Sequence, residues 1–178
     1  MSLAVAERQK YEKVWRNPAY GVYSPGEWAV PLFNQMVRRR GSLLDIGCGT
    51  GRAGARLRDL GWAVDFMDFV QATKEQPFFK QNLWSPWKRE WPASWEYGYC
   101  CDVMEHIPPK KTDAVQKNIT THCRNSFFTI HFGPDHFGGG DLHLNVKPFT
   151  WWRDKLKEHG TLKEARDMIG MGAFYLAG

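Results

Sequence analysis

Three glycines in one short segment carry the strongest chemical signal in the sequence. The segment reads LLDIGCGTGRAGARL over residues 43–57, and its alternating glycines stand at positions 47, 49 and 51. Glycine lacks the Cβ atom that keeps a ligand away from the backbone, and the first turn of a helix offers free N–H groups. A plain strand-to-helix turn needs only one or two glycines. The three glycines, preceded by Asp45, therefore predict a loop that binds a ligand.

Two classes of ligand fit this loop. Residues 49–54 read GTGRAG and match the G-x-G-x-x-G pattern of dinucleotide-binding proteins, which leaves an NAD(P)-dependent oxidoreductase as one alternative. Asp45 argues against that alternative, because a carboxylate before the loop repels a pyrophosphate and suits a cationic group. The chain also contains no Tyr-x-x-x-Lys pair, which a dehydrogenase of this kind would use at its substrate site.

The same residues resemble a known family. The stretch DIGCGTG, residues 45–51, resembles the first motif of the class I S-adenosylmethionine (SAM)-dependent methyltransferases, and three further motifs follow in the order of that family. Asp68 closes the second expected strand, Asn82 and Leu83 follow the third, and CDVMEHI, residues 101–107, follows the fourth. The resemblance covers residues 40–178. It implies SAM as cofactor and leaves the methyl acceptor open, and a SAM-binding protein without transfer activity is a further alternative.

The resemblance also implies which residues hold the cofactor. Asp68 would accept the two ribose hydroxyls, with Asp65 as the competing acid of the same strand, and Phe69 would cover the adenine ring. Asn82 stands where the family often has Asp. The full implied set is Asp45, Gly47, Cys48, Gly49, Gly51, Asp68, Phe69, Asn82, Leu83 and Cys101.

The loop after the fourth strand offers candidate catalytic residues. Histidine is the side chain best suited to act as a general base near neutral pH, which makes His106 a candidate, and Asp102 stands four residues before it. The alternative is that Glu105 and His106 only hold the loop while the enzyme positions its acceptor in line with the methyl group. We assign His106 and Asp102 as catalytic, with this alternative open.

Histidines and acids also gather after the fifth expected strand. They could together bind a divalent metal, but their spacing is irregular and three glycines interrupt them, so we expect no metal site. We assign His131, His136 and His143 to acceptor binding instead. The whole group is His131, Asp135, His136, Asp141 and His143.

The aromatic content points to the kind of acceptor. Nine Trp residues exceed what one core of this size normally takes, and several fall in the 84–95 segment or at Trp151 and Trp152. Exposed Trp rings stack on sugars and planar rings, so we expect a small-molecule or sugar-like acceptor between residues 84–95 and 136–152. The alternative is that these rings pack a satellite cluster. Nucleic acid is not expected, because no Pro-Cys pair occurs and the NPAY stretch, residues 17–20, precedes the glycine loop.

Strands alternate with helices along the chain, which predicts an α/β fold with a mainly parallel, seven-stranded, doubly wound Rossmann-like sheet and helices on both faces. Ligands of such sheets bind beyond the carboxyl ends of the strands. We expect one domain over residues 1–178, with residues 1–30 capping the cofactor. The expected strands are 42–46, 62–68, 77–83, 96–101, 126–132, 162–167 and 172–176, and the helices 1–16, 27–39, 52–60, 110–122 and 150–159.

Composition agrees with a folded domain. Of 178 residues, 43% are hydrophobic and 24% charged, with a net charge of +5. No apolar run approaches the ~20 residues that span a bilayer, and the first residues are too charged for a secretory signal. The four Cys form no CxxC pair. We therefore expect a soluble cytoplasmic protein without disulfides or a membrane partner.

Overall fold

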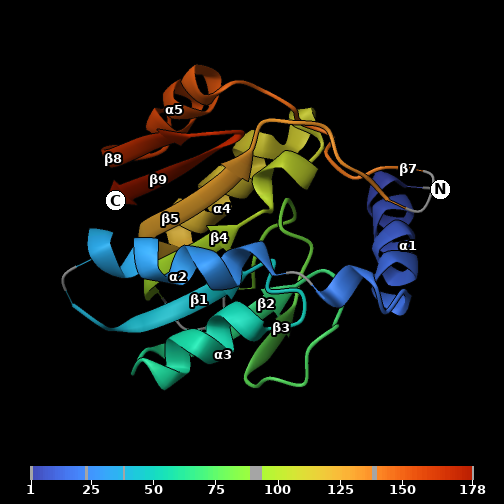
Figure 1. Ribbon diagram of the computed structural model, residues 1–178, viewed down its shortest axis with the longest axis horizontal. Helices are drawn as coiled ribbons and strands as arrows, with labels where there is room; N and C mark the ends of the chain where they lie inside the picture. Colours follow the sequence, from blue (N-terminus) through green and yellow to red (C-terminus); the bar gives the residue numbers. More distant parts are fainter. Residues whose placement is uncertain (1, 23, 38, 89–93, 138–139, 178) are drawn as a thin grey trace.

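A seven-stranded sheet with helices on both faces forms the body of the protein (Figure 1). The structure is a computed structural model, and it describes residues 2–22, 24–37, 39–88, 94–137 and 140–177. The strand order is β3-β2-β1-β4-β5-β9-β8. All neighbours pair in parallel except β9, which runs antiparallel to β5 and β8. The strands are β1 (Ser42–Ile46), β2 (Ala63–Asp68), β3 (Phe78–Lys80), β4 (Trp95–Cys101), β5 (Cys123–His131), β8 (Thr161–Met168) and β9 (Met171–Ala177).

Alternation along the central strand β1 separates two cores. Leu43 packs in a cluster with Phe33 and Leu57, from the helices on one face, whereas Leu44 packs with Ile119 and Leu156, from the helices on the other. Successive side chains of a strand point to opposite faces, so a fully buried strand carries apolar residues on both. The helices are α1 (Leu3–Arg16), α2 (Pro25–Met36), α3 (Arg52–Asp59), α4 (Thr112–His122) and α5 (Phe149–Lys157).

The predicted fold class is confirmed, and each predicted helix and strand has a counterpart within a few residues. The difference that bears on the site is β3, which ends at Lys80 although the apolar pattern extends to Leu83. Asn82 ends the extended conformation, because its side-chain oxygen accepts a hydrogen bond from the Trp84 amide at 3.1 Å and turns the chain. This turn directs Leu83 and Trp84 to the carboxyl ends of the strands.

The Trp residues belong mostly to the core. Trp87, Trp95 and Trp152 are at most 5% exposed and lie in the same hydrophobic cluster, and Trp151 packs against it. Trp91 lies outside the described residues. The satellite-cluster alternative therefore describes these rings better than an aromatic acceptor site. Trp84 is the exception in the 84–95 segment, because it lines a cavity at the carboxyl ends of the strands.

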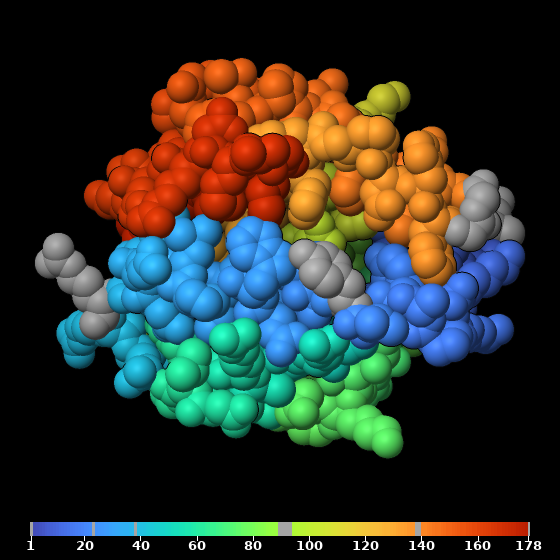
Figure 2. All heavy atoms as spheres, in the orientation of Figure 1, coloured from blue at the N-terminus to red at the C-terminus, as the bar shows by residue number. Residues whose placement is uncertain are grey.

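The N-terminal helix α1 stands at the carboxyl edge of the sheet, beside the small hairpin formed by β6 (His136–Phe137) and β7 (Gly140–Asp141) (Figure 1). The Lys10 ammonium lies 3.5 Å from the Asp141 carbonyl oxygen, and the rings of Tyr20 and Phe137 are 5.0 Å apart. In Figure 2 the blue N-terminal segment and the orange segment after β5 form one continuous surface at this end. No helix among the described residues is both long and apolar enough to cross a membrane.

Candidate cofactor and acceptor site

The glycine loop lies between the end of β1 and the start of α3, as predicted. Gly47, Gly49 and Gly51 have φ angles of +68°, +51° and +77°, a region that other residues rarely adopt. A Cβ atom on Gly49 would also lie 2.7 Å from the Trp15 ring. The loop therefore needs glycine both for its backbone conformation and for the close approach of α1.

Asp68 ends β2 and faces the loop. Its carboxylate accepts hydrogen bonds from the amides of Gly49 at 2.8 Å, Phe69 at 2.5 Å and Val70 at 3.2 Å. Burial raises the pKa of this carboxyl, and the three amides, that of Gly49 first, oppose the rise. Asp65, the competing acid, instead accepts a hydrogen bond from the Trp95 indole at 2.8 Å. Asp68 is thus the acid presented at the end of the strand.

Asp45 lies beneath the loop and is 4% exposed. One of its oxygens accepts a hydrogen bond from the Gly54 amide in the first turn of α3, at 3.0 Å. Burial raises the pKa of Asp45 to about 7, although that amide opposes the rise. The side chain still lines a cavity beside the loop, so a cationic group there would find a carboxyl facing it.

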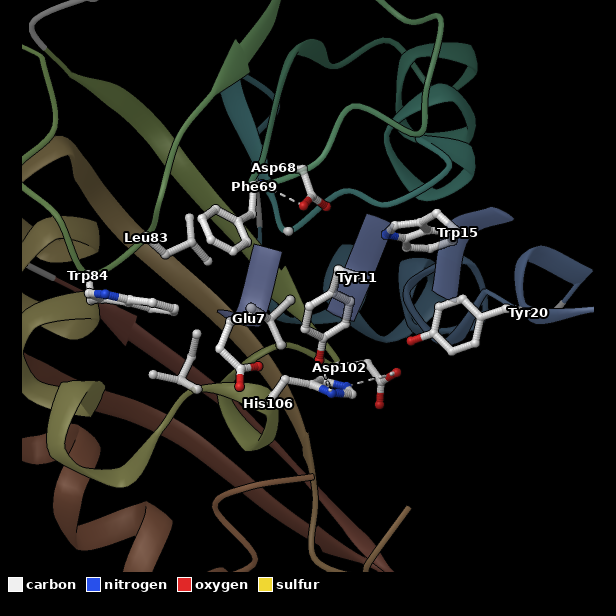
Figure 3. A pocket seen from close by; sticks show the side chains of 13 residues that line it. Glu7, Tyr11, Trp15, Tyr20, Asp68, Phe69, Leu83, Trp84, Asp102 and His106 are labelled. Carbon is white, nitrogen blue, oxygen red and sulfur yellow. Dashed lines mark hydrogen bonds and ion pairs between the residues drawn. The ribbon is translucent and has the colours of Figure 1, made fainter. Parts of the chain in front are cut away.

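Two adjoining cavities follow the loop. A cavity of about 290 Å³ is lined by Asp45, Gly47, Cys48, Gly49 and Cys101, among others. A smaller, mostly apolar cavity of about 100 Å³ lies between Asp68, Phe69, Leu83, Trp84 and the α1 side chains (Figure 3). The larger cavity is lined by the Asp45 carboxyl and by backbone groups of the glycine loop, and the smaller cavity has aromatic walls. Together the two cavities suit a ligand with a polar end and a flat ring.

Asp102 stands where these two cavities meet a third. It is the only described non-glycine residue with positive φ, at 59°, and it lines all three cavities. The third cavity, of about 430 Å³, is also lined by His131, Asp135 and His143. A strained backbone that persists is held in place by its surroundings and is common at functional sites. Here the Asp102 amide donates to the Thr129 carbonyl at 3.0 Å.

Glu105 forms hydrogen bonds with the end of β5 and with the segment after β7. Its side chain is fully buried, one oxygen accepts from the His131 amide at 2.6 Å, and its main-chain carbonyl accepts from the amides of Leu144 and Asn145. Burial, and then the charge of Asp102, raises the pKa of Glu105 well above its ordinary value. Asp102 differs: burial opposes its ionisation, but the histidines that face it, His106 first, hold its pKa below the ordinary value. Asp102 therefore carries the negative charge of the pair.

Helix α1 contributes residues that the sequence analysis missed. The Tyr11 hydroxyl lies 2.9 Å from Nδ1 of His106, and the Trp15 ring covers Gly49 (Figure 3). The expectation that residues 1–30 cover the site pointed to this helix without naming these side chains. The sequence feature that could have identified these side chains is their spacing, because Tyr11 and Trp15 are four residues apart and therefore lie on one face of a helix.

Some predicted site residues lie apart from the cavities. Asn82 directs its oxygen to the Trp84 amide, and Gly51 begins α3 without lining any cavity described above. His136 is 67% exposed and pairs with Asp141 at 2.6 Å on the hairpin, whereas His131 and His143 share the third cavity. The expected position of the acceptor between residues 84–95 and 136–152 stays a prediction: His143 of the second range lines the third cavity, and the described residues of the first range do not. The third cavity is bounded by Pro25, the end of β4 and the segment after β5.

Comparisons with known proteins agree on the fold. The chain resembles 1,6-didemethyltoxoflavin-N1-methyltransferase of Burkholderia thailandensis, solved with 1,6-didemethyltoxoflavin and S-adenosylhomocysteine, with a TM-score of 0.73 at 15% identity over 98% of this chain and 88% of that one. A TehB-like SAM-dependent methyltransferase of Corynebacterium glutamicum gives a TM-score of 0.66 at 17% identity, over 97% and 98% of the two chains. The glycopeptide N-methyltransferase MtfA, solved with SAM, gives 0.67 at 8% identity, over 88% and 95%.

No family model and no curated protein sequence matches the chain. The strand order and the antiparallel β9 nevertheless give the chain the fold of the class I SAM-dependent methyltransferases.

Proposed function

We propose that this protein is a SAM-dependent methyltransferase that acts on a small polar acceptor. The observation that carries the proposal is the position of Asp68. It ends β2, contacts the glycine loop through Gly49, and borders the apolar cavity that contains Phe69 and Trp84. A carboxylate has about four lone-pair sites, and three backbone amides occupy three of those on Asp68. The oxygen that accepts from Gly49 keeps one site for a ribose hydroxyl, and the second hydroxyl would take the place of one of the amides.

The other cofactor contacts follow from the two adjoining cavities. The cavity beside Asp45 and Gly47 suits the methionine end, whose ammonium would face the Asp45 carboxyl, and the apolar cavity suits the adenine ring. SAM, when bound, supplies a methyl group already activated on a sulfonium. Gly47 and Asp102 border both cavities and would lie beside that sulfonium.

The third cavity supports the class of acceptor. It opens at Asp102 and presents carboxylates and imidazoles, from Asp135, His131 and His143, to whatever fills it. Such walls hydrogen-bond to hydroxyl or amino groups and are poor partners for a purely apolar molecule. Two of the structural neighbours are named as methyltransferases of 1,6-didemethyltoxoflavin and of a glycopeptide, and both acceptors carry polar groups. Transfer would proceed through positioning of the acceptor in line with the methyl group, or with His106 as a base when no metal ion occupies it.

Calorimetric titration with S-adenosylhomocysteine tests the cofactor assignment. Asp68→Asn should weaken binding ~100-fold, which corresponds to about 3 kcal/mol, because a charged acceptor of hydrogen bonds becomes neutral. Asp65→Asn is the matched control on the same strand and should bind as wild type, since its side chain is occupied by Trp95. Equal affinities for wild type and a folded Asp68→Asn protein, or tight binding of NAD, would contradict the proposal.

Transfer of a labelled methyl group from SAM to pooled small-molecule alcohols, phenols and amines tests the second half of the proposal. Labelled product from at least one polar pool is expected. A protein that binds SAM and labels no pool would instead fit a SAM-binding protein without transfer activity.

A further inference from the structure

Three potential ligands for a metal ion converge beneath the α1 helix. Asp102 and His106 come from the loop after β4, and His143 comes from the segment after β7. One atom from each, two ring nitrogens and a carboxylate oxygen, lie within 4.8 Å of one another. Figure 3 shows the Asp102 and His106 side chains directed toward each other under Tyr11.

Backbone hydrogen bonds hold the two segments together. The main-chain carbonyl of Glu105, the residue before His106, accepts from the amides of Leu144 and Asn145 at 2.8 and 2.9 Å, and these two residues directly follow His143. The Asn145 side chain, 1% exposed, donates to the Thr112 hydroxyl at 2.9 Å. His143 is therefore held against the β4 loop by groups other than the proposed ligands.

The outer contacts of both histidines bear on which ring nitrogen is free to bind a metal ion. Nδ1 of His143 lies 2.6 Å from the Gly133 carbonyl, which only accepts hydrogen bonds, so a proton on Nδ1 leaves the lone pair of the neutral ring on Nε2. Nδ1 of His106 lies 3.2 Å from the Leu142 carbonyl and 2.9 Å from the Tyr11 hydroxyl, which can donate or accept. In the site proposed below, this Nδ1 carries the proton and Nε2 keeps the lone pair. A histidine that donates its other N–H to a backbone carbonyl is the usual arrangement around protein-bound metals.

The distances within the cluster leave room for an ion. Nε2 of His106 lies 4.0 Å from one Asp102 oxygen, and Nε2 of His131 lies 3.6 Å from the other. Both separations exceed a hydrogen bond. Ligand atoms around a tetrahedral ion with bonds of ~2.1 Å stand ~3.4 Å apart, so small side-chain rotations would complete such a site.

We propose that Asp102, His106 and His143 bind one divalent transition-metal ion of the zinc type, with His131 as an outer partner of Asp102. Two imidazoles and one carboxylate suit zinc, cobalt or iron(II), and they disfavour magnesium and calcium, which prefer oxygen ligands throughout. Three protein ligands leave a fourth position at the junction of the three cavities. That position is open to water or to an oxygen or nitrogen atom of the acceptor. The site differs from the sequence-based expectation of no metal.

The test is metal binding, which needs neither SAM nor an acceptor, so its failure is distinct from failure of the proposed function. Chelator-treated protein is titrated with Co²⁺, followed by its visible absorption, and with Zn²⁺ by calorimetry. One equivalent per chain and the intense bands of low-coordinate cobalt are expected. Mg²⁺ in excess should not displace either ion.

Matched variants locate the site. Asp102→Asn and His143→Ala should each weaken Zn²⁺ binding ~100-fold or more, since losing only an outer partner of a ligand already costs up to that much. Asn tolerates the positive φ at position 102, so this variant keeps the backbone, and circular dichroism checks the fold of both. His159→Ala is the control, because it removes an imidazole from the exposed Asp113, Glu158 and His159 cluster. Absence of stoichiometric Zn²⁺ binding, unchanged affinity in folded Asp102→Asn and His143→Ala proteins, or loss of binding in His159→Ala would overturn the proposal.

Discussion

Asp45 shows how a single buried carboxyl couples the ligand loop to the stability of the protein. Its pKa rises from an ordinary 3.8 to about 7 because burial penalises the charged form, and its hydrogen bond from Gly54 recovers only part of that penalty. A raised pKa in the folded state means that the folded protein binds more protons than the unfolded one between these values. The free energy of unfolding therefore falls as pH rises from about 4 to 7.

Asp45→Asn should remove this dependence. The wild-type protein loses up to ~4 kcal/mol at this site across that range, the product of the shift and about 1.4 kcal/mol per unit, whereas the amide does not titrate. Urea unfolding of both proteins at pH 4.5, 6 and 8 measures the difference. Asp68 also has a raised pKa and is present in both proteins, so its own contribution largely cancels, and the part that comes from its repulsion of Asp45 belongs to the predicted difference. A difference in stability that stays constant with pH would contradict the assignment.

At the scale of elements, helix α1 covers the smaller cavity. The roof of that cavity comes from Glu7, Tyr11 and Trp15, and its volume of about 100 Å³ is below the ~300 Å³ at which ligand pockets usually begin. Under the proposed function, the adenine end of the cofactor would enter this cavity only if α1 moved outward. The hydrogen bond between Tyr11 and His106 is one of the contacts that this movement breaks.

Tyr11→Phe should speed the association of S-adenosylhomocysteine. A neutral hydrogen bond contributes about 1 kcal/mol net, so opening, and with it the association rate, should rise ~5-fold. Stopped-flow Trp fluorescence follows the rate. Lys13→Ala, an exposed substitution on the same helix, serves as the control and should associate like wild type. If Tyr11→Phe and wild type associate at the same rate, α1 does not limit entry.

At the scale of the whole molecule, the site joins segments from most of the chain. Residues at its cavities come from α1, the ends of β1, β2 and β4, and the segment after β5, so a cofactor bound there contacts both halves of the sheet. A ligand that binds only the folded state stabilises it by RT ln(1 + L/Kd), where L is the concentration of free ligand.

S-adenosylhomocysteine should therefore raise the unfolding temperature of the whole chain. At a concentration 100 times its Kd the added stability is about 2.7 kcal/mol, or roughly 5–10 °C for a chain of this length. Differential scanning calorimetry with S-adenosylhomocysteine and with NAD gives the comparison. A shift with NAD that equals or exceeds that with S-adenosylhomocysteine would favour the oxidoreductase alternative over the proposed function.

The sequence by itself determined the order of strands and helices, the glycine loop and the acid at the end of β2. These features depend on short-range patterns: the alternation that buries Leu43 and Leu44 on opposite faces, and the glycines needed for positive φ. Only the tertiary structure decided that His143 joins His106 and Asp102, that His136 stays on the surface, and that Trp152 enters the core. Loop spacing carries no such information, because packing and long-range hydrogen bonds, such as those to the Glu105 carbonyl, bring distant segments together.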